Sequence, residues 1–155
     1  MADDRSATAA LSVGDRDPEL AEVLNQGLQE HNFAATRTSK QDRGVFSVKV
    51  TGADGQVIGG ITARTWAGLC EIGLLWVHPD HRKAGWGVRI LAAAEEEARR
   101  RGCDRICLST FTFQAPGFYQ KYGYAETGRT PGIPGGGQNV HMFKRLQPVP
   151  RPTAP

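Results

Sequence analysis

The sequence predicts a mixed α/β fold with α+β character, in which helices flank one central sheet. Short apolar runs bounded by turn residues are typical of strands. They alternate with segments whose apolar residues recur every three or four positions, as in helices. The resulting order, β, α, several β, α, β, α, β, β, is that of a mixed sheet with helices on its faces. At 155 residues, 39% of them hydrophobic and 23% charged, the chain has the length and composition of one globular domain.

The two ends of the chain are predicted to be disordered, and one domain is expected at 9–147. Residues 1–8 are small and polar, and residues 148–155 contain four prolines. The formal net charge of +3 is mild and its basic residues are scattered, so a nucleic-acid partner is not expected. No apolar stretch approaches the roughly 20 residues of a membrane helix, so no membrane partner is expected either.

The three cysteines favour a reducing compartment. Their number is odd, none of them forms a CxxC pair, and the chain starts without a signal sequence, so we expect reduced thiols and a cytoplasmic location. Cys103 and Cys107 have apolar neighbours and are expected to be buried filler.

The N-terminal part begins with a weak strand candidate at 9–13, followed by a helix at about 18–30. Asp17 fits the N-cap of this helix and Pro18 its first position. A stripe facing a core is predicted from its 3–4 spacing at Leu20, Val23, Leu24 and Leu28. Residues 32–43 are polar and irregular.

A meander of three strands follows, at 45–50, 56–66 and 69–77. Residues 53–55 turn the first pair and Gly68 turns the second. Residues 72–77 are almost wholly apolar, which is typical of a central strand buried on both faces.

A helix at 85–101 comes next and ends at Gly102. Its charge run contains three pairs of i,i+4 spacing, predicted to lie on a solvated face: Glu95 with Arg99, Glu96 with Arg100, and Glu97 with Arg101. A strand at 105–110, a short helix at 115–122 and strands at 124–127 and 140–146 complete the domain. Residues 128–137, rich in glycine and proline, are predicted to form a surface loop near a site.

The segment from Ile72 to Gly87 joins an apolar strand, a basic turn and a helix start. The first-turn amides of a helix have no partner within the helix, and the dipole there is positive, so this arrangement indicates a phosphorylated ligand. The pattern is not a Walker P-loop. It is not a dinucleotide fingerprint either, because Ile90 stands where the third glycine would be. A tight structural turn is the alternative interpretation.

Two motifs resemble those of one known family. Arg82, Lys83, Ala84, Gly85, Trp86 and Gly87 resemble motif A (R/Q-x-x-G-x-G/A) of the GNAT superfamily of acyl-CoA N-acyltransferases. Residues 118–124, FYQKYGY, resemble its F/L-Y-x-x-x-G-F/Y element, and residues 108–124 are similar to one bacterial subgroup of unassigned members. The likeness covers residues 69–127. It implies a mixed, mostly antiparallel sheet with splayed central strands, acetyl-CoA as co-substrate and no metal.

The resemblance also implies how coenzyme A would be held. The pyrophosphate would be wrapped by the amides of Lys83, Ala84, Gly85, Trp86, Gly87 and Val88, with added positive charge from Arg82 or Lys83. The pantetheine arm would pair like an added strand with the backbone of Leu75, Trp76 and Val77. The asparagine that helps to hold this arm in many relatives is replaced here by Thr112, and Gln114 is the alternative.

Tyr119 corresponds to the general acid of the superfamily. A phenol, with a pKa near 10, is suited to protonate a departing thiolate. The amide of Val77 or Trp76 would stabilise the oxyanion.

The general base is left open. Glu71 matches the spacing of the catalytic glutamate in the superfamily's histone acetyltransferases, but the closer subgroup more often has its acid where this chain has Gly73. A plain strand-edge role for Glu71 is equally consistent with the sequence. The other candidates are water and the histidines His78, His81 and His141.

The leading interpretation is an acetyl-CoA-dependent N-acetyltransferase that acts on a primary amine of a small molecule or peptide by direct attack in a ternary complex. The alternative is a non-catalytic acyl-CoA-binding sensor or regulatory module. Superfamily members modify antibiotics, polyamines, small metabolites and protein amines, and this sequence does not select among them. The acceptor groove is expected from residues 25–43, Trp66 and residues 128–141. Dimerisation is common in the superfamily, so a homodimer is one alternative.

Overall fold

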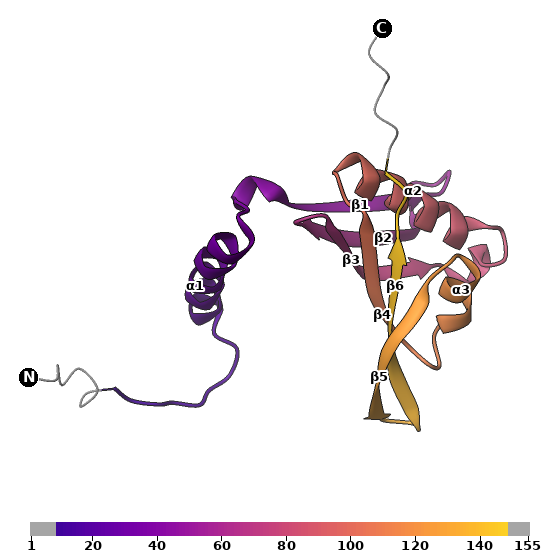
Figure 1. The fold of residues 1–155 in the computed structure, drawn as a ribbon. Helices are drawn as coiled ribbons and strands as arrows, with labels where there is room; N and C mark the ends of the chain where they lie inside the picture. The colour runs from indigo at the N-terminus through magenta and orange to yellow at the C-terminus, as the bar shows by residue number, and fades with distance from the viewer. Residues whose placement is uncertain (1–8, 149–155) are drawn as a thin grey trace, which may run out of the picture. The chain divides into compact units, whose positions relative to one another are not determined.

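The computed structural model describes residues 9–148 (Figure 1). The disorder predicted for residues 1–8 and for nearly all of 148–155 therefore lies outside the described residues. Contacts divide the described chain into two units, one ending at Thr38 and one starting at Ser39. Each unit is described by itself, and the single domain expected at 9–147 stays a prediction.

The first unit contains one helix, α1 (Pro18–Thr36), which starts where the sequence predicts. The Asp17 side chain caps it by accepting from the Leu20 amide at 2.9 Å. The helix continues to Thr36, beyond the predicted end. The strand predicted at 9–13 is wrong: Leu11 and Val13 are almost fully exposed, and no strand between residues 9 and 148 pairs with them.

The apolar stripe of α1 has no cover among the described residues of its own unit, 9–38. Its four members are each more than half exposed: Leu20, Val23, Leu24 and Leu28. The prediction that this stripe faces a core is therefore not met by the rest of this unit.

The second unit is built on a six-stranded sheet in the order β1-β2-β3-β4-β6-β5 (Figure 1). The strands are β1 (Arg43–Thr51), β2 (Val57–Trp66), β3 (Leu69–Val77), β4 (Arg105–Phe111), β5 (Ala125–Ile133) and β6 (Gly137–Arg145). Every neighbouring pair is antiparallel except β3 and β4, which are parallel. This confirms the predicted mixed, mostly antiparallel sheet flanked by helices.

The core of this unit lies between the sheet and the apolar face of α2 (Trp86–Arg100). Ile90, Leu91, Ala94 and Ala98 are all buried, as the helical spacing predicts. The short helix α3 (Pro116–Lys121) adds Tyr119 to the same cluster. Two single turns of 3-10 helix, η1 (Lys40–Asp42) and η2 (Pro79–His81), complete the elements, and none of the described helices is long and apolar enough to span a membrane.

Two predictions about strands are wrong. Residues 72–77 are not buried on both faces, because α2 packs on one face and leaves Leu74 71% and Trp76 48% exposed. Residues 128–137 do not form a long loop, because β5 runs to Ile133 and β6 starts at Gly137. β5 lies at the edge of the sheet, where Pro131 is tolerated because an edge strand does not need every ladder bond.

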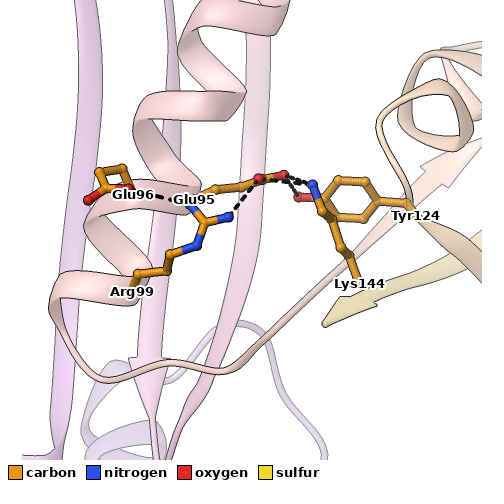
Figure 2. A network of polar contacts seen from close by, with 5 residues as sticks. All are labelled: Glu95, Glu96, Arg99, Tyr124 and Lys144. Carbon is orange, nitrogen blue, oxygen red and sulfur yellow. Dashed lines mark hydrogen bonds and ion pairs between the residues drawn. The ribbon is translucent and has the colours of Figure 1, made fainter. Parts of the chain in front are cut away.

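One member of the predicted solvated charge run, Glu95, is buried instead (Figure 2). Lys144 donates to both of its carboxylate oxygens at 2.9 Å, and the Tyr124 hydroxyl donates to Oε1 at 3.0 Å. Arg99 lies 3.7 Å away. The network joins α2 to the start of β5 and to β6, and burial together with the Glu95 charge raises the pKa of Tyr124.

The other charges of the run pair partly as predicted. Glu97 and Arg101 form the expected i,i+4 ion pair. Glu96 pairs with Arg99 and Arg100 pairs with Glu97, both at i,i+3 spacing, so the predicted pairing of Glu96 with Arg100 is wrong.

The thiols of Cys70 and Cys103 are expected to be unreactive in the folded protein, whereas Cys107 is only partly buried, contrary to its prediction as a buried residue. Cys70 is fully buried and Cys103 is nearly so. Burial raises the pKa of Cys70 to about 12 and also raises that of Cys103, so neither thiol forms much thiolate at pH 8. Titration with a thiol-specific disulfide reagent should label both only after a denaturant is added. Equal labelling rates with and without denaturant would contradict this burial.

The raised pKa of Cys70 also predicts that the free energy of unfolding falls at high pH. Above the ordinary thiol pKa of 9.0 the unfolded chain loses a proton that folded Cys70 keeps until about pH 12. The contribution of this thiol is therefore fully present below pH 9 and is lost as the pH rises from 9 to 12.

Candidate active site

The two central strands of the sheet pair along only part of their length. β3 and β4 are in register at residues 69–71 and 105–107, although β3 continues to Val77 and β4 to Phe111. Beyond this short ladder the strands separate. The backbone groups of β3 that face β4 therefore have no ladder partner over residues 72–77.

A bulge in β3 accompanies the separation. Thr62 pairs with Leu74 and Ala63 pairs with Ile72, which leaves Gly73 as the extra residue. The Leu74 amide donates to the Thr62 hydroxyl at 3.1 Å, and a Cβ at position 73 would lie 3.1 Å from the same oxygen. Glycine therefore suits this position, where a bulge redirects the strand.

A cavity of about 610 Å³ opens between the separated strands. Its walls come from β3, β4, α3 and the start of α2. The residues assigned from sequence that line it are Leu75, Trp76, Val77, Arg82, Gly87, Gln114 and Tyr119. Lining residues without a role assigned from the sequence include Phe113, which follows β4, and Phe118, which belongs to the quoted motif and lies on α3.

The loop between β3 and α2 has the backbone conformation expected of an anion site. Gly85 is the N-cap of α2 at φ 81°, and Lys83 is also left-handed at φ 64°. No side chain caps the helix, so its first-turn amides are left for another acceptor. A left-handed lysine is strained, and such strain is concentrated at functional sites.

Arg82 joins this loop to the cavity. Its Nε donates to the carbonyl oxygen of Val77 at 3.0 Å, which holds the guanidinium at the end of β3. Lys83, Ala84, Gly85, Trp86 and Val88 lie on the loop and the first helical turn beside the cavity but do not line it. Gly87 does line it, and a Cβ there would lie 3.5 Å from the Phe118 ring.

Tyr119 has the environment of a protonated acid. It is 7% exposed and packs edge-on against the rings of Phe118 and Tyr124. Burial raises its pKa above the ordinary value of 10.0. Within residues 9–148, burial alone shifts this pKa and no hydrogen bond to the Tyr119 hydroxyl contributes, which leaves its proton available to a ligand in the cavity that Tyr119 lines.

The structure distinguishes Thr112 from Gln114, the two residues predicted to hold the pantetheine arm. The Thr112 hydroxyl accepts from the Gln138 amide at 3.1 Å, so it is used to join β4 to β6, and Thr112 does not line the cavity. Gln114 does line it. The Gln114 Oε1 accepts from the Phe111 amide at 3.0 Å, which leaves its NH₂ group as a donor.

Glu71 lies away from the cavity, in a second hollow. This groove has a volume of about 340 Å³ and is lined by Leu69, Glu71, Cys107, Leu108, Ser109, Thr127, His141, Met142 and Phe143. Arg64 forms two hydrogen bonds to the Glu71 carboxylate, at 3.0 and 2.9 Å. Both side chains are substantially exposed, so the pair adds little stability, but it engages both carboxylate oxygens.

The groove also contains a hydrogen-bonded pair that the sequence did not reveal. The Ser109 hydroxyl lies 2.8 Å from His141 Nδ1. His141 was one candidate base among several, whereas Ser109 was not singled out. The sequence feature that could have indicated Ser109 is the alternation of β4, which places Ser109 on the opposite face from buried Leu108 and Thr110.

The two other histidines considered as bases lie in the loop between β3 and α2 instead. His78 and His81 contact each other edge-on at 5.8 Å, and His78 Nδ1 accepts from the Asp80 amide. Neither lines the cavity or the groove. In the part of the chain that the structure describes, no group of three His, Cys, Asp or Glu side chains has an arrangement that could hold a metal ion.

Comparisons with known proteins agree with this geometry. The family model described as "Acetyltransferase (GNAT) family" matches residues 14–124. The chain is 38% identical over 103 residues to blasticidin-S acetyltransferase of Streptomyces morookaense, covering 66% of this chain and 76% of that protein. It is 30% identical over 130 residues to acetyltransferase Atu2258 of Agrobacterium fabrum, covering 84% and 93%. The crystal structure of an acetyltransferase from Bacillus cereus superimposes with a TM-score of 0.76 at 28% identity, covering 88% of this chain and 98% of that chain.

Proposed function

We propose that this chain, which belongs to the GNAT family of acetyltransferases, transfers an acetyl group from acetyl-CoA to a primary amine of a small molecule or peptide by direct attack in a ternary complex. The observation that carries this proposal is the cavity between β3 and β4, which brings together an unpaired strand edge, an uncapped helix start and the largely buried Tyr119, which lines the cavity. These are the groups that an extended acyl-thioester arm with a pyrophosphate requires.

The residues fit coenzyme A from one end to the other. The pyrophosphate would be held by the first-turn amides at Gly85 and Gly87, where no side chain competes, with Arg82 adding positive charge. The amide-bearing arm would pair with the free edge of β3 as an added strand. The Gln114 NH₂ group would donate to an arm carbonyl.

The acyl transfer then needs two further groups from the protein. The thioester supplies an electrophilic carbonyl and a thiol leaving group. The amide of Val77 or Trp76, whichever points away from β2, would donate to the developing oxyanion. Tyr119, protonated because burial raises its pKa, would give its proton to the thiolate.

The acceptor is proposed to meet the thioester at the exposed rim of the cavity. Leu74, Trp76 and Phe113 all line the cavity and are between 48% and 71% exposed, so they offer an apolar contact surface. Because a relative of 38% identity is named as a blasticidin-S acetyltransferase, blasticidin S is the first acceptor to try.

Three further expectations stay proposals. One domain at 9–147 is supported by the family model, which starts at residue 14 and so includes α1. A cytoplasmic location is supported by three free cysteines. A homodimer is carried over from the family resemblance alone.

Calorimetric titration with acetyl-CoA tests the substrate, with ATP and NAD as controls. Saturable binding of acetyl-CoA alone is expected, and no binding would overturn the proposal. Thiol release is then measured with blasticidin S, spermidine and a peptide with an N-terminal alanine. Binding without turnover of any acceptor would favour the alternative of a non-catalytic acyl-CoA sensor.

A further inference from the structure

We propose that Ser109 and His141 form a relay that takes the proton from the acceptor amine. This inference rests on the proposed acetyl transfer and supplies the base that such a reaction needs. An amine that attacks a thioester becomes positively charged and must lose a proton before the amide is stable. Neither Tyr119, which acts as an acid, nor the amide that donates to the oxyanion accepts this proton.

The two side chains are placed by strand register. Ser109 on β4 and His141 on β6 are direct cross-strand partners, and their side chains meet on the face of the sheet away from α2. Ser109 Oγ lies 2.8 Å from His141 Nδ1, and Thr130 Oγ1 lies 3.2 Å from His141 Nε2. If Nε2 carries the hydrogen and donates to Thr130, Nδ1 has a free lone pair to accept from Ser109. Thr130 is then a positioning residue, since it selects the tautomer.

Ser109 stands where the two hollows meet. It lines both the cavity that holds Tyr119 and the groove that holds His141, and the other shared residue, Leu108, is apolar. An amine at this boundary would have the thioester on one side and the Ser109 hydroxyl on the other. The exposed Ser109 side chain is open to such a ligand.

The other titratable groups that face His141 are less suited to the role. Glu71, from β3, already accepts two hydrogen bonds from Arg64. Cys107, from β4, has a pKa raised by burial and by the nearby Glu71 charge, so it stays a neutral thiol.

The charged side chains of Glu126 and Arg129 on β5 pair with each other. Arg129 donates to Glu126 through two nitrogens, at 2.6 and 2.9 Å, and to Gln138 through a third. Among the groove-lining side chains within residues 9–148, the His141 imidazole is therefore the base whose ring nitrogen lies within hydrogen-bond distance of the Ser109 hydroxyl.

The proton balance of the step is complete. The neutral amine attacks the thioester carbon, the C–N bond forms and the carbonyl electron pair moves to oxygen. The nitrogen gives a proton to Ser109 Oγ as Ser109 passes its own proton to His141 Nδ1. The electron pair on oxygen then re-forms the carbonyl as the C–S bond breaks, and the thiolate takes the proton of Tyr119. Exchange with water returns a proton to Tyr119 and removes one from His141.

The test uses Ser109→Ala, His141→Asn and the double variant of the full chain, with acetyl-CoA and blasticidin S or the best acceptor of the panel above. Each single variant is expected to lose about 100-fold in kcat/KM at pH 7, the usual size of a general-base contribution. The double variant is expected to lose no more than either single one, because both belong to one relay. The ionisation of an imidazole base should be present in the wild-type pH profile and absent from that of His141→Asn.

Two controls separate a relay from a structural role. Ser47→Ala removes another exposed strand serine from the same face of the sheet, one that lines neither the cavity nor the groove, and should leave kcat/KM unchanged. Acetyl-CoA affinity and thermal stability should be unchanged in all variants. In nitrogen-15 spectra of the wild type, His141 should appear as the Nε2–H tautomer.

The outcomes distinguish the relay from the proposed function. An active wild type with unaffected Ser109→Ala and His141→Asn variants would overturn the relay alone. The same holds if Glu71→Gln, rather than His141→Asn, removes the ionisation from the pH profile. A wild type that acetylates no acceptor would overturn the proposed function, and the relay with it.

Discussion

Replacing Tyr119 with phenylalanine is expected to lower kcat about 10²- to 10⁴-fold while acetyl-CoA affinity stays nearly the same. The phenylalanine ring keeps the packing against Phe118 and Tyr124, so the cavity wall persists. What is lost is the hydroxyl proton, which has no partner among the described residues and is proposed to go to the departing thiolate. Steady-state kinetics measure the first effect and calorimetry with acetyl-CoA measures the second.

Tyr122→Phe is the matched control for this variant. Tyr122 also packs against Phe118, but it does not line the cavity, so its hydroxyl is not available to the thioester. We expect wild-type kcat for this control. Unchanged turnover in Tyr119→Phe would remove Tyr119 from the mechanism.

The raised pKa of Tyr119 adds a consequence for pH. The acid must be protonated to act, and burial keeps it so above its ordinary pKa of 10.0. The pH profile of kcat should therefore show no loss from Tyr119 ionisation below pH 10. A fall in kcat below that pH that disappears in Tyr119→Phe would contradict the assignment of a raised pKa.

Replacing Glu95 with alanine is expected to lower the free energy of unfolding by about 3 kcal/mol. The Glu95 side chain is only 9% exposed and is contacted by Lys144, Tyr124 and Arg99 (Figure 2). Its removal leaves a partly buried ammonium and a buried hydroxyl without their acceptor. For a chain of this length the melting temperature should fall by roughly 6–12 °C. Urea unfolding followed by circular dichroism measures the change.

Glu96→Ala is the control for this variant. Glu96 precedes Arg99 on the same helix, but its side chain is 69% exposed and its ion pair at 3.5 Å is screened by water. We expect a change within about 0.5 kcal/mol. Similar losses for both variants would show that helix propensity, and not the buried network, sets the effect.

The network matters for the site because of what it connects. Glu95 belongs to α2, whose first turn is proposed to hold the pyrophosphate, and Lys144 belongs to β6, which carries His141. Tyr124 packs against the ring of Tyr119 at 5.6 Å. Glu95 therefore connects α2 to β6, which carries His141, and to Tyr124, which packs against Tyr119.

The elements of the second unit follow closely from the sequence where a pattern is local. The helical stripe of Ile90, Leu91, Ala94 and Ala98 is buried as its spacing predicts. Strands β1 to β4 lie within a few residues of their predicted bounds. The predictions that failed concern the exposed face of residues 72–77 and the edge strand β5. Both depend on which elements pack or pair beside them in the fold, and a local sequence pattern does not contain this information.

The sequence by itself determined the family, the strand–loop–helix at residues 69–100 and the position of Tyr119 on a short helix. These features depend on residue types at fixed short spacings, such as glycines at a helix start or a tyrosine in a short helix. The local backbone requires such residues whatever the rest of the fold is. Only the tertiary structure decided that β3 separates from β4, that Glu95 is buried and that Ser109 meets His141. The last pair is 32 residues apart in the chain, and strand register alone makes the two residues neighbours. Register arises from the packing of whole strands, which periodicity within one segment cannot specify.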